Sequence, residues 1–440
     1  MVIIFVIGIN SLKYNHSTDR NVENNTIVEK KFLELLFFIL TMISYDGIMF
    51  ALSPLRICTI NAIPRAAATA SANFTSTVRN RMNSTSNTKP WPVKMVESNG
   101  DYLEESWLEG ERNVMYSNQS ELPNLPIPLI KDTLKRFVPT AMPLAESEKE
   151  RRSLQNAVDK FATQASTLQQ RLLDRFNDNK DSSWLQHWWN TLGYLQIRDS
   201  VVINVSYYFN FQDDNTIIRT NNSDVGGGTS TSPQIQRAAA ILYASGKYRN
   251  LVTSGRLKPD TIGRDKKPLC MTAYKYMFHA CRIPRPEQDS YRIYDPSVFR
   301  HAIVAYKGRF YTIPLIDNAT GEVFSVSVLE SSLKLIMQSI NNDDDAISEI
   351  GYLTGDNRDV WAKARASLLE CPGMPEALEL LESGCVVLNL ETTNPVSKAQ
   401  CGRQYLYGNG YNRWYDKSVQ LVVSPNGKAG LIGEHSMMDG

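Results

Sequence analysis

The residues best suited to proton transfer are a histidine and an acidic side chain close to the C-terminal end. His435 and Asp439 lie four positions apart in "GEHSMMDG". If the chain is helical there, the carboxylate shares a face with the imidazole and can hold one tautomer and raise its basicity. The pair therefore indicates a general base. The alternative is a structural histidine that is hydrogen-bonded to a nearby carbonyl group.

The other histidines and a search for common catalytic motifs provide no comparable candidate for catalysis. His187, His279 and His301 are interpreted as satisfied surface or core residues, and His16 lies in a segment of doubtful origin. The sequence has no G-x-S-x-G, no G-x-G-x-x-G after a strand and no H-E-x-x-H, and "VGGGTSTS" lacks the G-K-[ST] ending of a P-loop. A base without a visible nucleophile suits direct transfer of a group between two bound substrates.

A predicted β-hairpin positions His435. Two apolar runs flank "SPNG" within residues 418–433, and Pro-Asn-Gly favours a tight turn between two strands. His435 therefore follows the second strand of the hairpin. The ends of strands and the loops after them often carry functional groups.

The chain is predicted to be globular, with mixed α/β content, from about residue 121. Apolar residues at helical spacing predict helices, and β-branched or aromatic runs predict strands. The expected helices cover 145–179, 184–196, 332–340 and 359–370; the expected strands cover 200–211, 301–315 and 384–390; a surface loop is expected over 221–234.

Charge and cysteine content narrow the class of protein. The 440 residues carry 47 Lys+Arg and 46 Asp+Glu, a balance that does not indicate nucleic acid or an anionic membrane as a main partner. None of the six cysteines forms a C-x-x-C pair or has zinc-ligand spacing beside histidines. We therefore expect reduced thiols, mostly buried, in a reducing compartment, and no metal site.

The first 95 residues fall into two segments. Residues 1–48 contain apolar runs that are shorter than the ~20 residues of a membrane span; we interpret them as a leader that is not native, with a signal anchor as the alternative. Residues 49–95 contain no acidic side chain and are rich in Ser, Thr, Ala and basic residues. This composition predicts a disordered mitochondrial presequence, or alternatively a basic tail. Residues 96–120 are interpreted as a linker.

Five segments between Leu122 and Gly440 together resemble the choline/carnitine acyltransferase family, in the family's order. They are "LPNLPIPLIKDTLKRF", "WLQHWWNTLGYLQIRDSVVIN", "KKPLCMTAYKYMFHACRIPRPEQD", "GYLTGDNRDVWAKAR" and "NRWYDKSVQLVVSPNGKAGLIGEHSMMDG". In the third segment Lys266 stands where glycine is usual. The most specific match is NRW-aromatic-DK followed at this distance by EH.

The resemblance implies a mechanism for His435. At the position of the family's catalytic histidine, it would deprotonate the carnitine hydroxyl for attack on acetyl-CoA, or the CoA thiol in the reverse direction, without an acyl-enzyme. Asp439 matches the family's acidic partner, often Glu, and its shorter side chain changes the reach. Arg413 and Asp416 of "NRWYDK" are expected to be structural.

The resemblance also assigns two aromatic residues to a substrate pocket. Trp189 and Tyr194 match positions that line the family's carnitine pocket, and an aromatic face suits a trimethylammonium group. Core packing is the better interpretation of Trp184 and Trp188, and it is the alternative for Trp189.

The resemblance implies a CoA-dependent acyltransferase fold, like that of chloramphenicol acetyltransferase. Residues 121–440 would form the first of two related α/β domains, with leading helices. The second half, with the CoA-binding residues, would be missing, so the chain as given is expected to be an inactive fragment. The alternative is a shortened, non-catalytic relative that acts as a binding partner.

The expected reaction is reversible acetyl transfer between CoA and carnitine, for acetyl shuttling between organelles. CoA would be a co-substrate rather than a tightly bound cofactor, and no nucleic-acid partner is expected. The complete protein would be a monomer on the matrix side of the inner mitochondrial membrane, compatible with peripheral association. A later start at Met82 or Met95 would give a peroxisomal form. Longer-chain carnitine acyl transfer and choline acetyl transfer are the alternatives.

Overall fold

The structure, a computed structural model, describes residues 93–96, 102–105, 114–178, 183–214, 217, 231–339 and 349–438. The predicted leader lies outside the described residues, as does most of the predicted presequence and linker. The chain divides into two compact units. One contains the described residues of 124–184, and the other contains those before 124 and after 184.

The described part of the smaller unit contains three α-helices, α4 (Ile130–Ala141), α5 (Glu148–Gln164) and α6 (Ser166–Asp178), and the 3-10 turn η5 (Met142–Leu144) between the first two. Ser147 begins α5 with a capping box, in which its hydroxyl accepts from Glu150 N and the Glu150 carboxylate accepts from Ser147 N. The predicted single helix over 145–179 is therefore two helices, separated at the fully buried Ala165. Beyond this break, the Gln169 side chain accepts a hydrogen bond from Ile130 N, which ties α6 to the start of α4.

The larger unit is built on a six-stranded mixed sheet in the order β3-β12-β11-β10-β8-β9. Strands β8, β10 and β11 are parallel to one another, while β9, β12 and β3 pair with their neighbours in antiparallel fashion. The strands are β3 (Tyr207–Asn210), β8 (His301–Tyr306), β9 (Arg309–Pro314), β10 (Val387–Leu390), β11 (Val419–Val423) and β12 (Ala429–Gly433).

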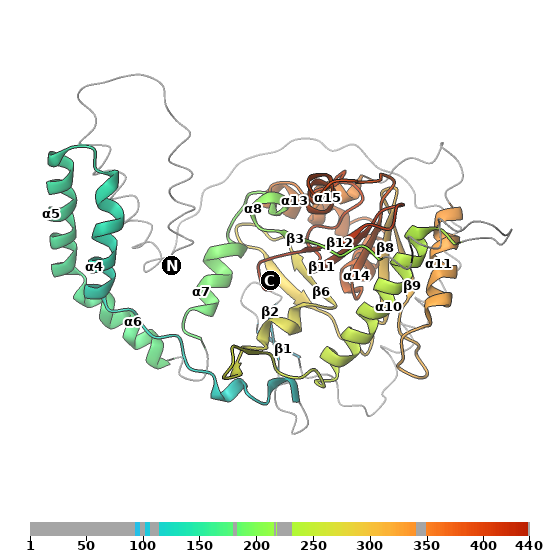
Figure 1. The fold of residues 1–440 in the computed structure, drawn as a ribbon, viewed down its shortest axis with the longest axis horizontal. Coiled ribbons are helices and arrows are strands. Elements are labelled where there is room, and N and C mark those ends of the chain that lie inside the picture. The colour runs from blue at the N-terminus through green and yellow to red at the C-terminus, as the bar shows by residue number, and fades with distance from the viewer. Residues whose placement is uncertain are drawn as a thin grey trace, which may run out of the picture. The chain divides into compact units, whose positions relative to one another are not determined.

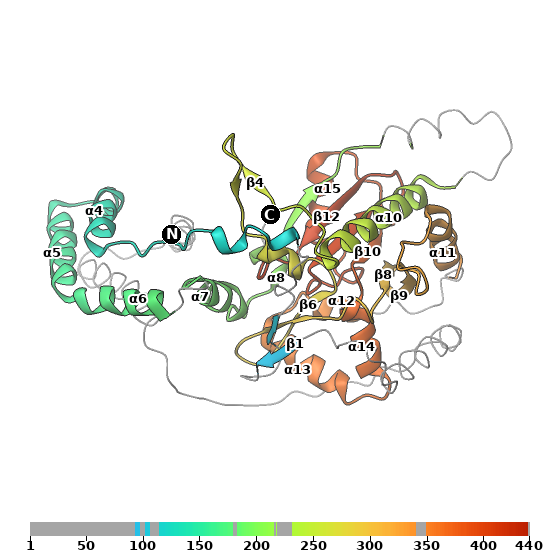
Figure 2. The same cartoon turned by 90° about the horizontal axis from the view of Figure 1, so that it is seen from below.

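Helices cover both faces of this sheet. On β8, Ala302 and Val304 join one core cluster with residues of α10 (Pro233–Thr253) and α11 (Val326–Gln338). The intervening Ile303 and Ala305 join another cluster with residues of α13 (Arg358–Leu369) and α14 (Met374–Ser383). This alternation is the period of two of a strand that is buried on both faces. The packed pair α10 and α11 is visible in Figures 1 and 2.

Shorter elements complete the larger unit. The helices are α7 (Gln186–Asn190), the π-helix η6 (Thr191–Leu195), α8 (Val201–Asn204), α12 (Ile350–Leu353) and α15 (Lys398–Leu406), and the 3-10 turns are η3 (Val114–Tyr116), η4 (Gln119–Glu121) and η7 (Thr272–Tyr276). Three two-stranded sheets pair β1 (Val93–Val96) with β2 (Tyr102–Glu105), β4 (Thr261–Ile262) with β5 (Lys267–Pro268), and β6 (Ala280–Ile283) with β7 (Ser290–Ile293).

The mixed α/β prediction is confirmed, and two of the predicted strands need correction. The first half of 200–211 is the helix α8, because the Ser200 side chain accepts from Val202 N and caps a helical turn. The run 301–315 is a hairpin rather than one strand. Lys307 and Gly308 both have positive φ, 49° and 77°, which turns the chain between β8 and β9.

Two further observations concern the described part of the chain. Within it, no helix is both long and apolar enough to cross a membrane. Its five cysteines are free thiols; Cys58 lies outside it. The buried ones are Cys281, Cys385 and Cys401, and the exposed ones are Cys270 and Cys371.

Candidate active site

His435 lies two residues beyond β12, at the end of the predicted hairpin. The hairpin prediction is confirmed, since β11 and β12 pair in antiparallel register from Val419↔Gly433 to Val423↔Ala429. Gly427 has φ 79°, a conformation that favours glycine in the turn. The imidazole is half-buried at the strand exit.

Two tyrosine rings hold the imidazole. The Tyr194 hydroxyl lies 3.3 Å from His435 Nδ1, and the two rings meet edge to face with centroids 5.4 Å apart. The ring of Tyr207 on β3 makes a second such contact at 5.1 Å. Local sequence patterns do not identify Tyr207, because its place depends on the pairing of β3 with β12, in which Tyr207 lies opposite Gly433.

The aromatic helix contains a π-helical turn that carries Tyr194. Residues Thr191–Leu195 form this turn directly after α7. π-Helical turns are rare in proteins, and those that occur are often at functional sites. Trp189, on α7, is 38% exposed and lies edge-on to the Tyr194 ring at 6.2 Å. Trp189 is therefore not a core residue. Together with Tyr194 and Tyr207 it forms the aromatic group around His435.

The other tryptophans of this segment differ in environment. Trp184 is buried within the smaller unit, where its indole N–H donates to the Leu125 carbonyl at 2.7 Å. Trp188 is half-buried. Core packing is thus the observed role of Trp184, as predicted.

In the sequence of the described chain, the acidic residue next to His435 is Glu434. Asp439 lies outside the described residues, and residues 435–438 are not helical. The helix on which the predicted His435–Asp439 pairing depended is therefore not formed as far as Met438. Glu434 is fully buried, and its carboxylate accepts from the Ser436 hydroxyl at 2.6 Å and the Ser436 N–H at 3.2 Å.

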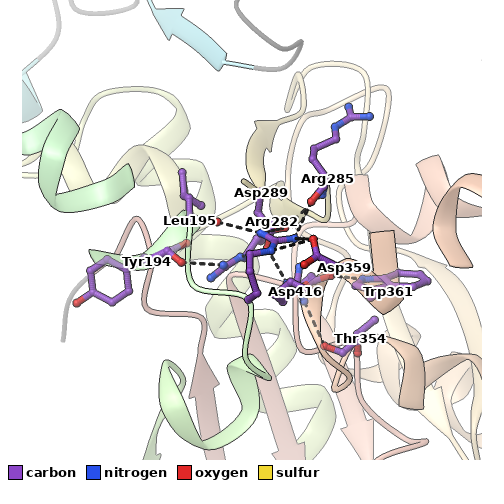
Figure 3. A network of polar contacts seen from close by, with 12 residues as sticks. Tyr194, Leu195, Arg282, Arg285, Asp289, Thr354, Asp359, Trp361 and Asp416 are labelled. Atoms are coloured by element: carbon purple, nitrogen blue, oxygen red, sulfur yellow. Dashed lines mark hydrogen bonds and ion pairs between the residues drawn. The ribbon is translucent and has the colours of Figure 1, made fainter. Parts of the chain in front are cut away.

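A largely buried ionic network includes Glu434 and contacts the Tyr194 carbonyl through Arg282. Figure 3 shows its centre, where Arg282 lies beside Asp289. Six ion pairs link three guanidinium groups to four carboxylates: Arg198, Arg282 and Arg358 with Asp289, Asp359, Asp416 and Glu434.

Asp289 and Asp416 have different electrostatic environments in this network. Burial alone would raise the pKa of the Asp289 carboxyl, but Arg358, Arg282 and Arg198 hold it below its ordinary value. Burial raises the pKa of Asp416 to about 6, against the opposing effect of Arg358. Asp289 pairs with three guanidinium groups and Asp416 pairs with Arg358, which accounts for the opposite directions of the two pKa shifts.

Residues of "NRWYDK" are buried in polar contacts, which supports the structural role expected of them. Asp416 accepts from the Trp361 indole at 2.7 Å and pairs with Arg358 at 2.8 Å. Arg413 pairs with Glu391.

The remaining described histidines are either buried and hydrogen-bonded or exposed. His279 accepts from Arg249 Nε at 3.0 Å, and burial lowers its pKa well below the ordinary value. His301 contacts the Leu380 carbonyl, and burial lowers its pKa to about 4. His187 is exposed. In the part of the chain that the structure describes, no group of three or more His, Cys, Asp or Glu side chains could hold a metal ion.

Comparison with known proteins gives consistent matches. The model of the choline/carnitine O-acyltransferase family matches residues 125–440. The chain is 28% identical over 335 residues to "Carnitine O-acetyltransferase, mitochondrial" of Saccharomyces cerevisiae, covering 75% of this chain and 48% of that protein. It is 27% identical over 380 residues to "Carnitine O-palmitoyltransferase 2, mitochondrial" of Rattus norvegicus (79% and 54%). It is 29% identical over 343 residues to "Choline O-acetyltransferase" of Homo sapiens (74% and 43%). The chain spans about half the length of these relatives.

Proposed function

The chain belongs to the choline/carnitine O-acyltransferase family, and from this we propose that it carries the general base of an acyl transfer between CoA and carnitine. The observation that carries the proposal is the contact of Tyr194 Oη with His435 Nδ1. It engages Nδ1 of the imidazole, which supports Nε2 as the nitrogen that exchanges a proton with the substrate.

The proposed reaction needs no covalent enzyme intermediate. In the forward direction His435 Nε2 takes the proton of the carnitine hydroxyl as its oxygen attacks the thioester carbonyl of acyl-CoA. The tetrahedral intermediate collapses with cleavage of the C–S bond, and the imidazolium returns the proton to the CoA sulfur. The reverse reaction begins with deprotonation of the CoA thiol. Holding both substrates beside one base supplies proximity and acid–base catalysis.

The aromatic group is proposed to bind the trimethylammonium end of the substrate. Tyr194 contacts His435, and Trp189 extends from it with an exposed ring. Aromatic faces attract quaternary ammonium groups. Asp439 is proposed, from the resemblance alone, to assist His435.

The acyl preference is the finer part of the proposal. Relatives named for carnitine acetyl, carnitine palmitoyl and choline acetyl transfer match at 28%, 27% and 29% identity. We propose acetyl transfer to carnitine, with the resemblance of the sequence segments as support. We also propose mitochondrial location, in keeping with the names of two of these relatives.

The proposed architecture is the first of the two domains of a CoA-dependent acyltransferase fold. The mixed sheet with helices on both faces is compatible with it. In such an architecture the second domain would supply the residues that bind CoA. We therefore propose that the chain alone has little or no transfer activity.

The test measures thiol release from acetyl-CoA or palmitoyl-CoA with carnitine or choline as acceptor. The chain would be assayed alone and joined to the C-terminal half of the yeast carnitine O-acetyltransferase. We expect activity in the joined protein, highest with acetyl-CoA and carnitine. It should fall by at least ~100-fold in His435→Ala. His187→Ala, which replaces an exposed histidine, is the matched control and should leave the rate unchanged. Activity that survives His435→Ala would refute the assignment.

A further inference from the structure

Arg282 is the one side chain among the described residues that bonds both to Tyr194 and to Glu434, the residue directly before His435. It lies on β6, fully buried, in the segment "ACRIP". Its Nη2 donates to the Tyr194 carbonyl at 2.9 Å, and its Nη1 pairs with Glu434 at 3.2 Å. Its Nε donates to Asp289 at 2.7 Å.

We propose that Arg282 is a positioning residue that sets the geometry between Tyr194 and His435. The proposal rests on the function proposed above for His435. Figure 3 shows that the Tyr194 carbonyl faces Arg282 while the phenol ring points away from it. The guanidinium thus holds the backbone of the π-helical turn and leaves the hydroxyl directed to the imidazole.

The second contact of Arg282 fixes the residue before the histidine. Glu434 is bound by Arg282 on one oxygen and by Ser436 on the other. The backbone N–H of Glu434 also donates to the Ser418 carbonyl on the neighbouring chain segment at 3.0 Å. His435 therefore lies between Glu434 and Ser436, whose polar groups are hydrogen-bonded, and this limits the movement of its imidazole.

Only an arginine can make these three contacts together. The planar guanidinium carries five N–H groups in a rigid fork, whereas lysine has a single nitrogen. Arg282→Lys keeps the charge near Asp289 but cannot reach Asp289, Glu434 and the Tyr194 carbonyl at once. Arg365 is a matched control, because it is buried and pairs with Glu382 through two nitrogens without contacting Tyr194 or Glu434.

The test uses the rate at which diethyl pyrocarbonate modifies each histidine of the full chain, measured by peptide mass spectrometry. His187 is the exposed reference, and the buried His279 and His301 report loss of the fold. We expect Arg282→Lys to raise the rate at His435 about fivefold, the effect of losing one hydrogen bond. His279 and His301 should stay protected. Arg365→Lys should leave the rate at His435 unchanged.

A double variant separates positioning from general loosening. Tyr194→Phe should also raise the rate at His435. If Arg282 acts through Tyr194, Arg282→Lys combined with Tyr194→Phe should give no more than the larger single effect. An unchanged rate in Arg282→Lys or an equal increase in Arg365→Lys would overturn the proposal, and single effects that multiply would overturn the action of Arg282 through Tyr194.

A further variant keeps the proposal testable if Arg282→Lys unfolds the protein. If His279 and His301 become reactive in Arg282→Lys, the decision passes to Glu434→Gln, which keeps the side-chain size and removes the charge facing Arg282. A faster reaction at His435 with a protected core supports positioning, and an unchanged rate overturns it. Since these rates need no turnover, failure of the acyltransferase assay would leave this test intact.

Discussion

At the scale of single residues, the candidate site depends on how the imidazole of His435 is held. One tyrosine hydroxyl faces Nδ1, and two tyrosine rings pack edge-on against the imidazole. Such contacts reduce the number of ring orientations without adding a formal charge beside the base. The first prediction therefore concerns the hydroxyl alone.

Tyr194→Phe removes the hydroxyl and keeps the ring. We expect kcat for carnitine acetylation in the joined protein to fall about fivefold, which corresponds to one hydrogen bond of ordinary strength. The KM for carnitine should change little, because the aromatic face remains. Steady-state kinetics would check both values. An increase in the KM for carnitine with kcat unchanged would show that the hydroxyl binds substrate and does not orient His435.

Lys417 is a second residue with a distinctive environment. It is fully buried, its ammonium donates to the Glu382 carbonyl, and burial lowers its pKa from 10.5 to about 8. Cys281, Cys385 and Glu382 oppose this shift. Between about pH 8 and pH 10.5 Lys417 therefore binds more protons in the unfolded chain than in the folded one, and its contribution to the free energy of unfolding rises with pH.

We expect Lys417→Met to lack this rise. The difference between the parent and the variant should change by roughly 3 kcal/mol across the window. Urea unfolding at several pH values would measure it. The exposed Lys363 provides the control, since Lys363→Met should leave the pH dependence as it is. A parent-minus-variant difference that stays flat with pH would contradict the prediction.

At the scale of elements, the close approach of β3, β12 and α15 determines where the rings of Tyr207 and Tyr405 can lie. A Cβ on Gly430 would come within 2.4 Å of the Tyr405 ring and 2.6 Å of the Phe209 carbonyl. On Gly433 it would come within 2.4 Å of the Tyr207 ring. Glycines at these two β12 positions thus make room for the neighbouring strand and helix.

Gly430→Ala should consequently destabilise the larger unit by about 1–3 kcal/mol, the usual cost of overpacking. Backbone atoms on one side of the clash leave little room for relaxation. Gly193→Ala is the matched control, because a Cβ there meets nothing within 4 Å. Chemical denaturation of both variants gives the comparison. Equal midpoints for the two would show that β12 and α15 can separate without cost.

At the scale of the whole larger unit, Asp289 connects segments that are far apart in the sequence. Its carboxylate pairs with Arg198, Arg282 and Arg358, and its backbone N–H donates to the Leu195 carbonyl. Removing one charge from a buried network leaves its partners uncompensated, which is costlier than the loss of an exposed ion pair.

We predict that Asp289→Asn lowers the free energy of unfolding by about 3–5 kcal/mol at pH 7. Despite burial, the arginines lower the folded-state pKa of Asp289 below 3.8, so the ionised group stabilises the fold above that pH. The difference between parent and variant should shrink as the pH falls through the folded pKa. Asp359→Asn, which alters the half-exposed partner of Arg198, should cost less than about 1 kcal/mol. Similar losses for the two variants would argue against the network.

The sequence by itself determined the features that depend on local patterns. Turn residues predicted the hairpin that ends at His435, and apolar spacing predicted the helix that carries Trp189 and Tyr194. The motifs in order indicated the family that the comparison then showed. Such features could be found because turn chemistry and helical periodicity are written in neighbouring residues. The α10 helix escaped prediction, although Ser232 and Pro233 are a strong start signal.

Only the tertiary structure decided which residues surround the base. Tyr194 and His435 are 241 positions apart, and Arg282 and Glu434 are 152 apart. Tyr207 reaches His435 because β3 pairs with β12, and Arg282 on β6 reaches the π-helical turn through the Tyr194 carbonyl. Sheet order and long-range ion pairs follow from how whole faces are buried together, and no local pattern specifies them.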